Sequence, residues 1–289
     1  MTRSAQGHAA MLAFSALVAG SFSLGALAAP HVDPAVLSAL RFAVATGILG
    51  GVVLATGGRL TARAPWRWAV LGGLMAAYFV LMFEGLKTAD AVSTAAVFTL
   101  TPVMAAGFGW LFLRQRTTAR MALALALGAA GALWVIFRAD LGALMRLEIG
   151  RGEEIYFWGC AAHAAYAALV RKLNRGESAV VSTFLTMAGG TVVLMLWSAP
   201  ALRATDWAAL PGIVWVTLAY VSIAATATTT FLVQFASLRL PAAKVMAYTY
   251  LVPSWVILWE VAMHGTLPPA MVAMGVVLTV AALVLLLKD

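Results

Sequence analysis

The amino-acid sequence predicts an all-α integral membrane protein with ten transmembrane helices, arranged as two inverted five-helix repeats. Of its 289 residues, 63% are hydrophobic and only 10% are charged, which leaves too little polar surface for a water-soluble globule. The apolar residues fall into stretches of about 20 residues, the length at which a helix crosses the hydrocarbon core of a bilayer. In addition, part of the first half of the chain reappears in the second half.

Short segments rich in Pro, Gly and charged residues separate the apolar stretches, and such segments are typical of turns. The predicted spans of the first half are 9–28, 35–56, 66–86, 91–113 and 119–137. Those of the second half are 155–174, 179–198, 208–235, 242–263 and 268–287. Their continuous runs of Ala, Leu, Val and Gly do not alternate with polar residues, so membrane β-strands are not indicated.

The first apolar stretch has a second interpretation. Arg3, the apolar run and Ala26-Leu27-Ala28 also match a signal peptide with its cleavage site. Alanine is so frequent in this chain that such a triplet carries little information, and cleavage would leave nine spans in unequal halves. We therefore expect the first helix to remain uncleaved.

The repeat relates residues 78–87 to residues 230–239. Both copies keep two phenylalanines and one leucine at the same positions and end in a basic residue, Lys87 in the first and Arg239 in the second. Each copy is followed, in the next apolar stretch, by a proline, Pro102 or Pro253. The match therefore covers two consecutive spans, and it indicates that the chain contains two related halves.

Ten spans divided between two halves give five each, and an odd number places the two copies in opposite orientations. We expect the first repeat to cover residues 1–148 and the second to cover residues 149–289. Many alternating-access carriers are built from inverted repeats, and their substrate site lies near the membrane midplane between the halves. We therefore expect the helices that carry the repeat to contribute to a substrate site.

The positions of Lys and Arg predict the orientation in the membrane. If the N-terminus is cytoplasmic, most of the 19 Lys and Arg residues fall in cytoplasmic segments, as the positive-inside rule requires. Both termini are therefore predicted to be cytoplasmic, in a bacterial-type inner (plasma) membrane. The net charge of +8 is spread over loops beside spans and forms no patch large enough for nucleic acid.

Polar and aromatic residues inside spans are candidates for substrate binding, because each must find a partner or face a cavity. The candidates are Tyr78, Met82, Thr94, Thr101, His163, Tyr166, Gln234 and Tyr248. His163 and Tyr166 are three residues apart and so share a helix face. Each candidate also has a structural alternative: a histidine can pair with a neighbouring helix, and threonine hydroxyls in membrane helices usually bond to their own backbone.

A second set of residues is expected to have gating or structural roles: Arg41, Pro102, Pro253, Glu84, Lys87 and Glu260. Arg41 can extend to the outer surface, fix a carboxylate or serve structure, and we favour a structural or gating role. The spacing of Glu84 and Lys87 predicts an ion pair. Glu260 is a candidate proton-coupling group, although its place near the end of a span favours an interfacial carboxylate.

The residues at these positions resemble a known family. The stretch Ala39-Leu40-Arg41-Phe42, the two ends of the repeated segment and the prolines in the spans resemble the drug/metabolite transporter superfamily, most closely its EamA-type branch. The stretch 161–166 resembles the sixth span of YddG-type amino-acid exporters. Two departures stand out: Arg114-Gln115 replaces a Gly-Glu pair, and His163 stands where relatives often have tryptophan.

The resemblance implies a transporter without naming its cargo. We expect an alternating-access exporter of small metabolites, with aromatic or other neutral amino acids as the leading class. The alternatives are an exporter of drugs or cations and, further away, a membrane enzyme. The four histidines are scattered and no metal spacing or nucleophile motif is present, so no cofactor, metal or enzyme activity is expected. The expected partners are a small-molecule substrate and the bilayer, and a monomer is compatible with this architecture.

Overall fold

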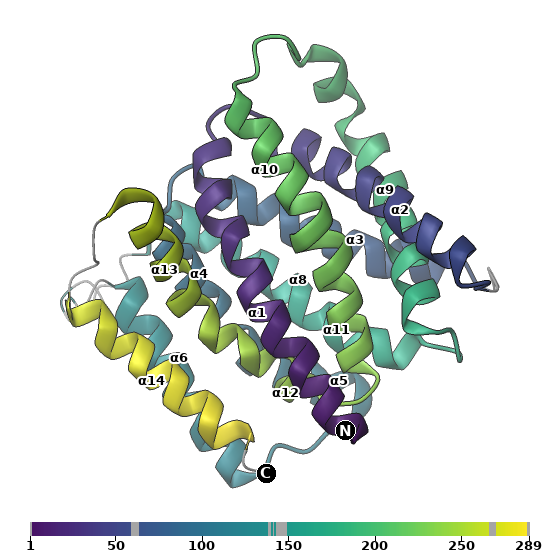
Figure 1. Ribbon diagram of the computed structural model, residues 1–289. Coiled ribbons are helices and arrows are strands. Elements are labelled where there is room, and N and C mark those ends of the chain that lie inside the picture. The colour runs from purple at the N-terminus through teal and green to yellow at the C-terminus, as the bar shows by residue number, and fades with distance from the viewer. Residues whose placement is uncertain are drawn as a thin grey trace.

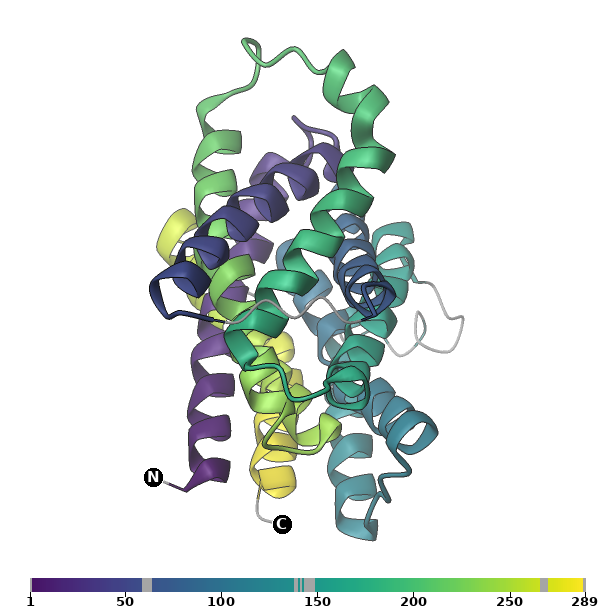
Figure 2. The ribbon, with the colours of Figure 1, turned by 90° about the vertical axis from the view of Figure 1, so that its right-hand side faces the viewer.

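The computed structural model describes residues 2–58, 64–137, 140, 142, 149–265 and 270–287. Within these ranges every regular element is a helix. The predicted boundary between the halves at 148/149 and the first residues of the predicted tenth span lie partly outside the described residues. The helices form one bundle, and the N- and C-termini lie at the same end of it in both views (Figures 1 and 2).

The helices of the first half follow the predicted spans closely. They are α1 (Arg3–Ala28), α2 (Pro34–Ala55), α3 (Trp66–Gly85), α4 (Ala91–Phe98), α5 (Thr101–Leu113) and α6 (Ala119–Ile136). Side chains of Asp33, Asp90 and Thr118 accept hydrogen bonds from backbone N–H groups in the first turns of α2, α4 and α6. These residues therefore determine where the three helices begin.

The second half contains more interruptions. Its elements begin with α8 (Arg151–Leu173), α9 (Ala179–Ala204), α10 (Gly212–Ser222), the π-helix η1 (Ile223–Thr228) and α11 (Thr229–Ser237). They continue with α12 (Ala242–Met246), the 3₁₀-helix η2 (Ala247–Leu251), α13 (Val252–His264) and α14 (Ala270–Leu287). The predicted eighth and ninth spans thus each consist of three consecutive helical segments.

Eight helices within the described residues are long and apolar enough to cross a membrane, counting α4–α5, α10–α11 and α12–α13 as one span each. The helix α8 is not among them, and its first and last turns carry Glu153, Glu154, Arg171 and Lys172. In α14 the apolar helix Ala273–Leu287 is shorter than the others. The protein is therefore a multi-pass membrane protein, and the number of ten spans stays a prediction.

The two prolines of the repeat lie where a predicted span is interrupted. Helix α4 ends at Phe98 and α5 begins at Thr101, so Pro102 is in the first turn of α5. In the second half, η2 precedes α13, and Pro253 is in the first turn of α13. Proline is well suited to a first turn, because its missing N–H would have no partner there. Both spans are therefore divided at equivalent positions instead of being single helices.

Helix α10 passes into the π-helix η1 before α11 begins, and nothing in the sequence pattern predicted this. Two threonine hydroxyls follow the wide turn: Thr226 Oγ1 donates to the carbonyl of Val221, and Thr228 Oγ1 donates to that of Ile223, each five residues back. Single π-turns are frequent at functional sites, because they widen the helix and free backbone groups. Here the wide turn faces the middle of α2.

Packing between the halves follows a repeated pattern. Helix α3 packs along α8, and the matching helix α11 packs along α1. In the same way α5 contacts α8, and α13 contacts α1, while α6 and α14 pack on each other. Each contact that a helix of the first half makes with the second half therefore has a counterpart in which the halves are exchanged. A two-fold relation between the halves requires this pattern.

Two glycine pairs allow close contact between helices. A side chain at Gly72 of α3 would meet the backbone of Gly190 in α9, and one at Gly131 of α6 would meet the backbone of Gly275 in α14. Small residues at such crossings let membrane helices approach and gain van der Waals contact. These pairs join elements of the first half to elements of the second.

Candidate functional site

Aromatic rings from four helices meet in the middle of the bundle. The imidazole of His163 on α8 stacks on Tyr78 of α3, with ring centroids 4.3 Å apart and planes inclined by 17°. Phe98 of α4 and Phe14 of α1 also stack with this imidazole, at 5.5 and 6.2 Å, and Tyr166 lies at 6.2 Å. We call these five residues the aromatic stack. It joins both halves of the chain.

The aromatic stack is closed to solvent in this conformation. Each of its five side chains is at most 2% exposed. Tyr156, about two turns before His163 on α8, donates its hydroxyl to the hydroxyl of Tyr78 at 3.4 Å. Access to the stack therefore requires helices to move apart, as they do when a carrier changes conformation.

Several polar atoms beside the stack have no hydrogen-bond partner. They include Nδ1 of His163 and the hydroxyl of Tyr166, both of which belong to the stack. The hydroxyl of Tyr166 approaches Gln234 but does not reach hydrogen-bond geometry. Buried polar groups normally find partners, and those that lack one need an explanation. A ligand that brings its own donors and acceptors would supply the missing hydrogen bonds.

The other predicted binding residues have mixed surroundings. Gln234 is buried, accepts a hydrogen bond from Ser182 at 3.3 Å and donates one to Thr186 at 3.2 Å, so it ties α11 to α9. Thr94 donates to the carbonyl of Asp90 at the start of α4, and Thr101 donates across the interruption to the carbonyl of Phe98 at the end of α4. Both hydroxyls therefore bond to nearby backbone, as threonines in membrane helices usually do. Met82 lies buried in the apolar core one turn after Tyr78. The side chain of Gln234 also lies beside the hydroxyl of Tyr166.

Tyr248 lies in a different environment. Its hydroxyl is 3.1 Å from Nδ1 of His8, near the start of α1, and the two rings lie 6.0 Å apart. Its ring contact is therefore with His8 and not with the aromatic stack. The sequence made Tyr248 a binding candidate in the ninth predicted span, and the structure places it in the 3₁₀-helix η2 beside His8.

Arg41 is fully buried in the middle of α2. Its Nε donates to Thr226 Oγ1 at 2.7 Å, and its Nη2 lies 3.4 and 3.3 Å from the carbonyl oxygens of Val221 and Ala225. Its guanidinium carbon lies 3.8 Å from the ring centroid of Phe79. Arg41 therefore does not extend to the surface, and it contacts the π-helix η1 of the other half.

The remaining charged candidates lie near the ends of helices. Lys87 Nζ is 2.8 Å from Glu84, as the i, i+3 spacing predicts, and both side chains are more than one third exposed. Glu260 is 3.2 Å from His264 in the last turn of α13, where its side chain is 27% exposed. Surface pairs of this kind contribute little to stability, and neither carboxylate faces the aromatic stack.

A buried ion pair between the halves was not found from the sequence. Arg67, at the start of α3, donates to Glu177 at 2.7 Å and to the carbonyl of Leu173 at the end of α8. Burial alone would raise the pKa of Glu177, but the hydrogen bonds from Arg67 and from the N–H of Arg175 outweigh it and lower that pKa. The two residues are 110 positions apart, so no local spacing indicated the pair.

A buried carboxylate was also missed. Glu153, in the first turn of α8, is 8% exposed and accepts a hydrogen bond from Ser93 at 2.6 Å. It lines a cavity of about 270 Å³ whose other walls are mostly apolar and include Phe137, Phe157 and Trp158. The sequence placed Glu153 just before the predicted sixth span, so it was not recognised as an acid within the membrane region.

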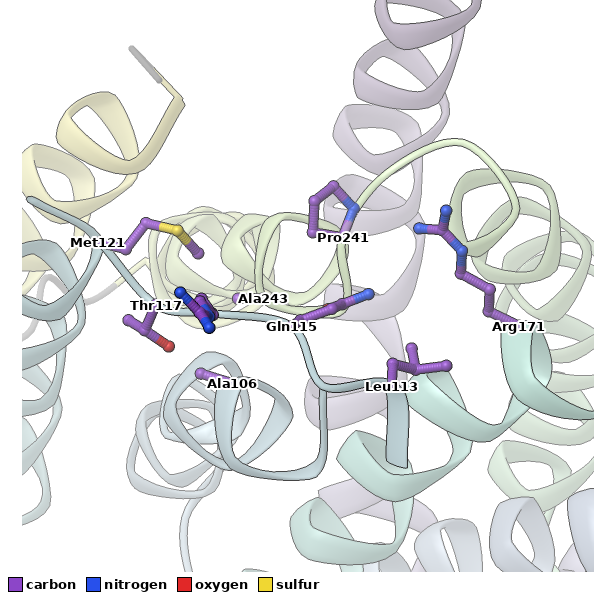
Figure 3. Close-up of a pocket in the computed structure, with 9 residues that line it drawn as sticks. Ala106, Leu113, Gln115, Thr117, Met121, Arg171, Pro241 and Ala243 are labelled. Atoms are coloured by element: carbon purple, nitrogen blue, oxygen red, sulfur yellow. The ribbon is translucent and has the colours of Figure 1, made fainter. Parts of the chain in front are cut away.

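A second cavity, of about 390 Å³, lies between the halves. Its lining residues are Ala106, Leu113, Gln115, Arg116, Thr117, Met121, Arg171, Pro241 and Ala243. Figure 3 shows Arg171 of α8 on one side and Met121 on the other. Arg171 is eight residues after His163, about 12 Å along the helix. The segment α12, which carries the lining residue Ala243, lies near the N-terminus in Figure 1. We call this cavity the arginine cavity.

Comparison with known proteins adds three findings. The model of the EamA-like transporter family matches this chain twice, over residues 5–137 and 153–288. The uncharacterized transporter YyaM of Bacillus subtilis (strain 168) is 25% identical over 217 residues, which are 73% of this chain and 71% of YyaM. A solved structure described only as a crystal structure of a protein superposes with a TM-score of 0.72 at 20% identity, covering 98% of this chain and 95% of its own. This last likeness concerns the fold alone.

Proposed function

This chain belongs to the EamA-like transporter family, and we propose that it is an alternating-access carrier that exports amino acids with aromatic or other neutral side chains. The aromatic stack carries this proposal: it is buried at the contact between the halves, and it combines flat apolar faces with polar atoms that lack partners. An apolar side chain would lie against the rings, while the polar groups of the cargo would bond to His163 and Tyr166.

The two family repeats would work as inverted halves. In this proposal each half contributes one discontinuous span, α4–α5 in the first and α12–α13 in the second. Discontinuous helices in related positions of the two halves are typical of the substrate sites of secondary transporters. Movement of one half against the other would open the aromatic stack first to one side and then to the other.

The arginine cavity would be the cytoplasmic entrance. It lies at the end of the bundle with both termini, which the positive-inside rule assigns to the cytoplasm of a bacterial-type inner membrane. Arg116 and Arg171 would attract cargo with a negative group. A single chain holds both halves, so a monomer would suffice for transport.

The test is counterflow in proteoliposomes that contain the purified protein. Labelled phenylalanine, tryptophan, leucine and alanine should exchange against unlabelled internal amino acid, and His163→Ala should reduce the exchange at least tenfold without changing the amount of folded protein. Lys87→Gln, on the exposed ion pair, is the matched control and should exchange normally. If the wild-type protein exchanges none of these amino acids, the cargo assignment is wrong.

One observation favours a second candidate, the export of amphiphilic cations. Glu153 is a buried carboxylate on the wall of an apolar, aromatic cavity, and such a site suits a hydrophobic ammonium compound. In that case Glu153→Gln should abolish efflux of a lipophilic cation, such as tetraphenylphosphonium, and leave amino-acid counterflow intact. Normal cation efflux by Glu153→Gln would remove this candidate.

A further inference from the structure

Arg41 is the most deeply buried cation of the described residues that has no carboxylate partner. No described carboxylate lies within ion-pair distance of it, and its Nη1 has no hydrogen-bond partner. Arg67 provides the contrast, because it is equally buried and meets Glu177 at 2.7 Å. Taking a cation out of water costs several kcal/mol unless an anion and hydrogen bonds compensate it. At Arg41 this compensation is incomplete.

The contacts that Arg41 does make hold the guanidinium in a fixed orientation. Its Nε–Nη2 edge faces the π-helix η1, with the hydroxyl of Thr226 and two backbone carbonyls as acceptors. The ring of Phe79 covers one face at 3.8 Å, and Phe83 lies at 5.5 Å. These neutral partners offset part of the cost of burial. These contacts leave Nη1 of the Arg41 guanidinium available to a ligand.

Arg41 lies next to the aromatic stack. Phe79, which covers the guanidinium, has its ring centroid 4.6 Å from that of Tyr78, and Tyr78 stacks directly on His163. One ring therefore separates the cation from the stack. In a conformation that opens the stack, a molecule the size of an amino acid would place an aromatic side chain against Tyr78 and a small anionic group near Arg41.

We propose that Nη1 of Arg41 binds the carboxylate of the cargo, so that the central site selects molecules carrying a carboxylate beside an apolar group. This inference rests on the proposed transport through the aromatic stack and adds the chemical class of its ligand. A planar guanidinium matches a planar carboxylate in geometry, and the charge-assisted hydrogen bond is stronger than a neutral one. The bound carboxylate also supplies the missing counter-charge.

The experiment uses four small probes with the purified, full-length protein and measures binding by equilibrium dialysis. L-Phenylalanine carries both charged groups, 3-phenylpropionate only the carboxylate, L-phenylalaninamide only the ammonium, and 3-phenylpropionamide neither. We expect the two carboxylates to bind at least tenfold more tightly than their amides, about 1.4 kcal/mol. Equal binding of each acid and its amide by the wild-type protein would overturn the proposal without any variant.

Two substitutions then assign the effect to Arg41. In Arg41→Gln each acid should bind about as tightly as its amide, so that the preference for the acid is lost. The affinity for the two amides should stay within about twofold of the wild-type value. Arg41→Lys keeps the charge and should retain part of the preference. Arg239→Gln is the matched control, because Arg239 also lies over a phenylalanine ring, Phe235, but outside the stack. A full acid preference in Arg41→Gln would show that another group binds the carboxylate.

The probes separate this inference from the proposed function. If 3-phenylpropionate binds through Arg41 but no amino acid exchanges in proteoliposomes, the carboxylate site stands and the amino-acid cargo is wrong. If phenylalanine exchanges and phenylalaninamide exchanges equally well, the transporter stands and the carboxylate site is wrong. If Arg41→Gln fails to fold, the comparison of acids with amides on the wild-type protein still decides the question.

Discussion

At the scale of single residues, the central feature is a histidine held between aromatic rings. His163 lies 4.3 Å from the ring centroid of Tyr78 and keeps one ring nitrogen without a partner. Its stacking serves structure, and its nitrogen is available to a ligand. Substitutions that separate these two properties show which of them transport requires.

We predict that His163→Phe keeps the protein folded but impairs transport. Phenylalanine has a similar ring and preserves stacking with Tyr78 and Phe98, so the melting temperature should change by only a few degrees. The hydrogen bond to the cargo is lost, which corresponds to roughly 1 kcal/mol or about fivefold in affinity. Counterflow kinetics and a thermal melt measure the two effects; unchanged counterflow would mean that the imidazole is purely structural.

The buried pair of Arg67 and Glu177 yields a prediction about stability. Glu177→Gln leaves the Arg67 guanidinium without this carboxylate, and breaking one side of a buried pair costs about 3–5 kcal/mol. The melting temperature in detergent should fall by several degrees. Glu84→Gln, which breaks an exposed pair, is the control and should change it little.

The same pair should make stability depend on pH with a defined sign. The pKa of Glu177 is lower in the folded protein than its usual value of 4.5. Its stabilisation is therefore complete above about pH 5 and is lost as the pH falls through the folded-state pKa. The melting temperatures of wild type and Glu177→Gln should converge on acidification from pH 6 to pH 3. If the difference between the two melting temperatures stays constant over this pH range, the charge of the Glu177 carboxylate is not the cause of the stabilisation.

At the scale of elements, the interruptions of helices distinguish this bundle from a set of simple spans. The break between α4 and α5, the π-helix η1 and the 3₁₀-helix η2 all lie in elements that contact the first helix or the stack. Interrupted helices expose carbonyls and hydroxyls that a continuous helix would use internally. Arg41 makes use of such groups on η1.

We predict that Thr226→Val weakens the contact between α2 and the π-helix. Valine has nearly the same shape as threonine but cannot accept the hydrogen bond from Nε of Arg41, which is then left unpaired in a buried position. The loss of stability should be roughly 2 kcal/mol, and amide exchange in residues 221–229 should become faster. Thr228→Val, at the exposed hydroxyl of the same turn, is the matched control; equal effects of the two would show that Arg41 is not responsible.

At the scale of the whole molecule, the arrangement of the halves predicts reciprocal access. The aromatic stack is closed, while the arginine cavity is open at the end of the bundle that carries both termini. In a carrier with alternating access, residues on the two sides of the site are exposed in different conformations. In a channel both sides are exposed together.

The corresponding test introduces Met121→Cys in the arginine cavity and, separately, Ile149→Cys at the other cavity, in a Cys160→Ala background. Addition of a transported substrate should increase the labelling of one cysteine by a water-soluble maleimide and decrease that of the other. A cysteine at Leu54, on the exposed surface of α2, should label independently of substrate. Parallel changes at Met121→Cys and Ile149→Cys would contradict alternating access.

The sequence predicted those features that depend on local chemistry. The ion pair of Glu84 with Lys87 follows from a rule that acts within one turn of helix. The place of Pro102 beside an interruption follows from the same kind of rule, although the sequence predicted one continuous span over 91–113 and the structure has two separate segments. Of the candidate binding residues, Tyr78, His163 and Tyr166 lie together in the stack, whereas Tyr248 lies beside His8, and their roles in binding stay predictions.

By itself the sequence determined that the bilayer is the solvent, that the chain contains two related halves, and which stretches of the chain are apolar spans. Only the tertiary structure decided which faces of the helices meet, and hence the partners of Arg41, Arg67 and Glu153. The physical reason is that a helix in a membrane is apolar both where it faces lipid and where it packs on other helices. Its polarity pattern therefore does not distinguish the inner face, and contacts between distant residues have to be found in three dimensions.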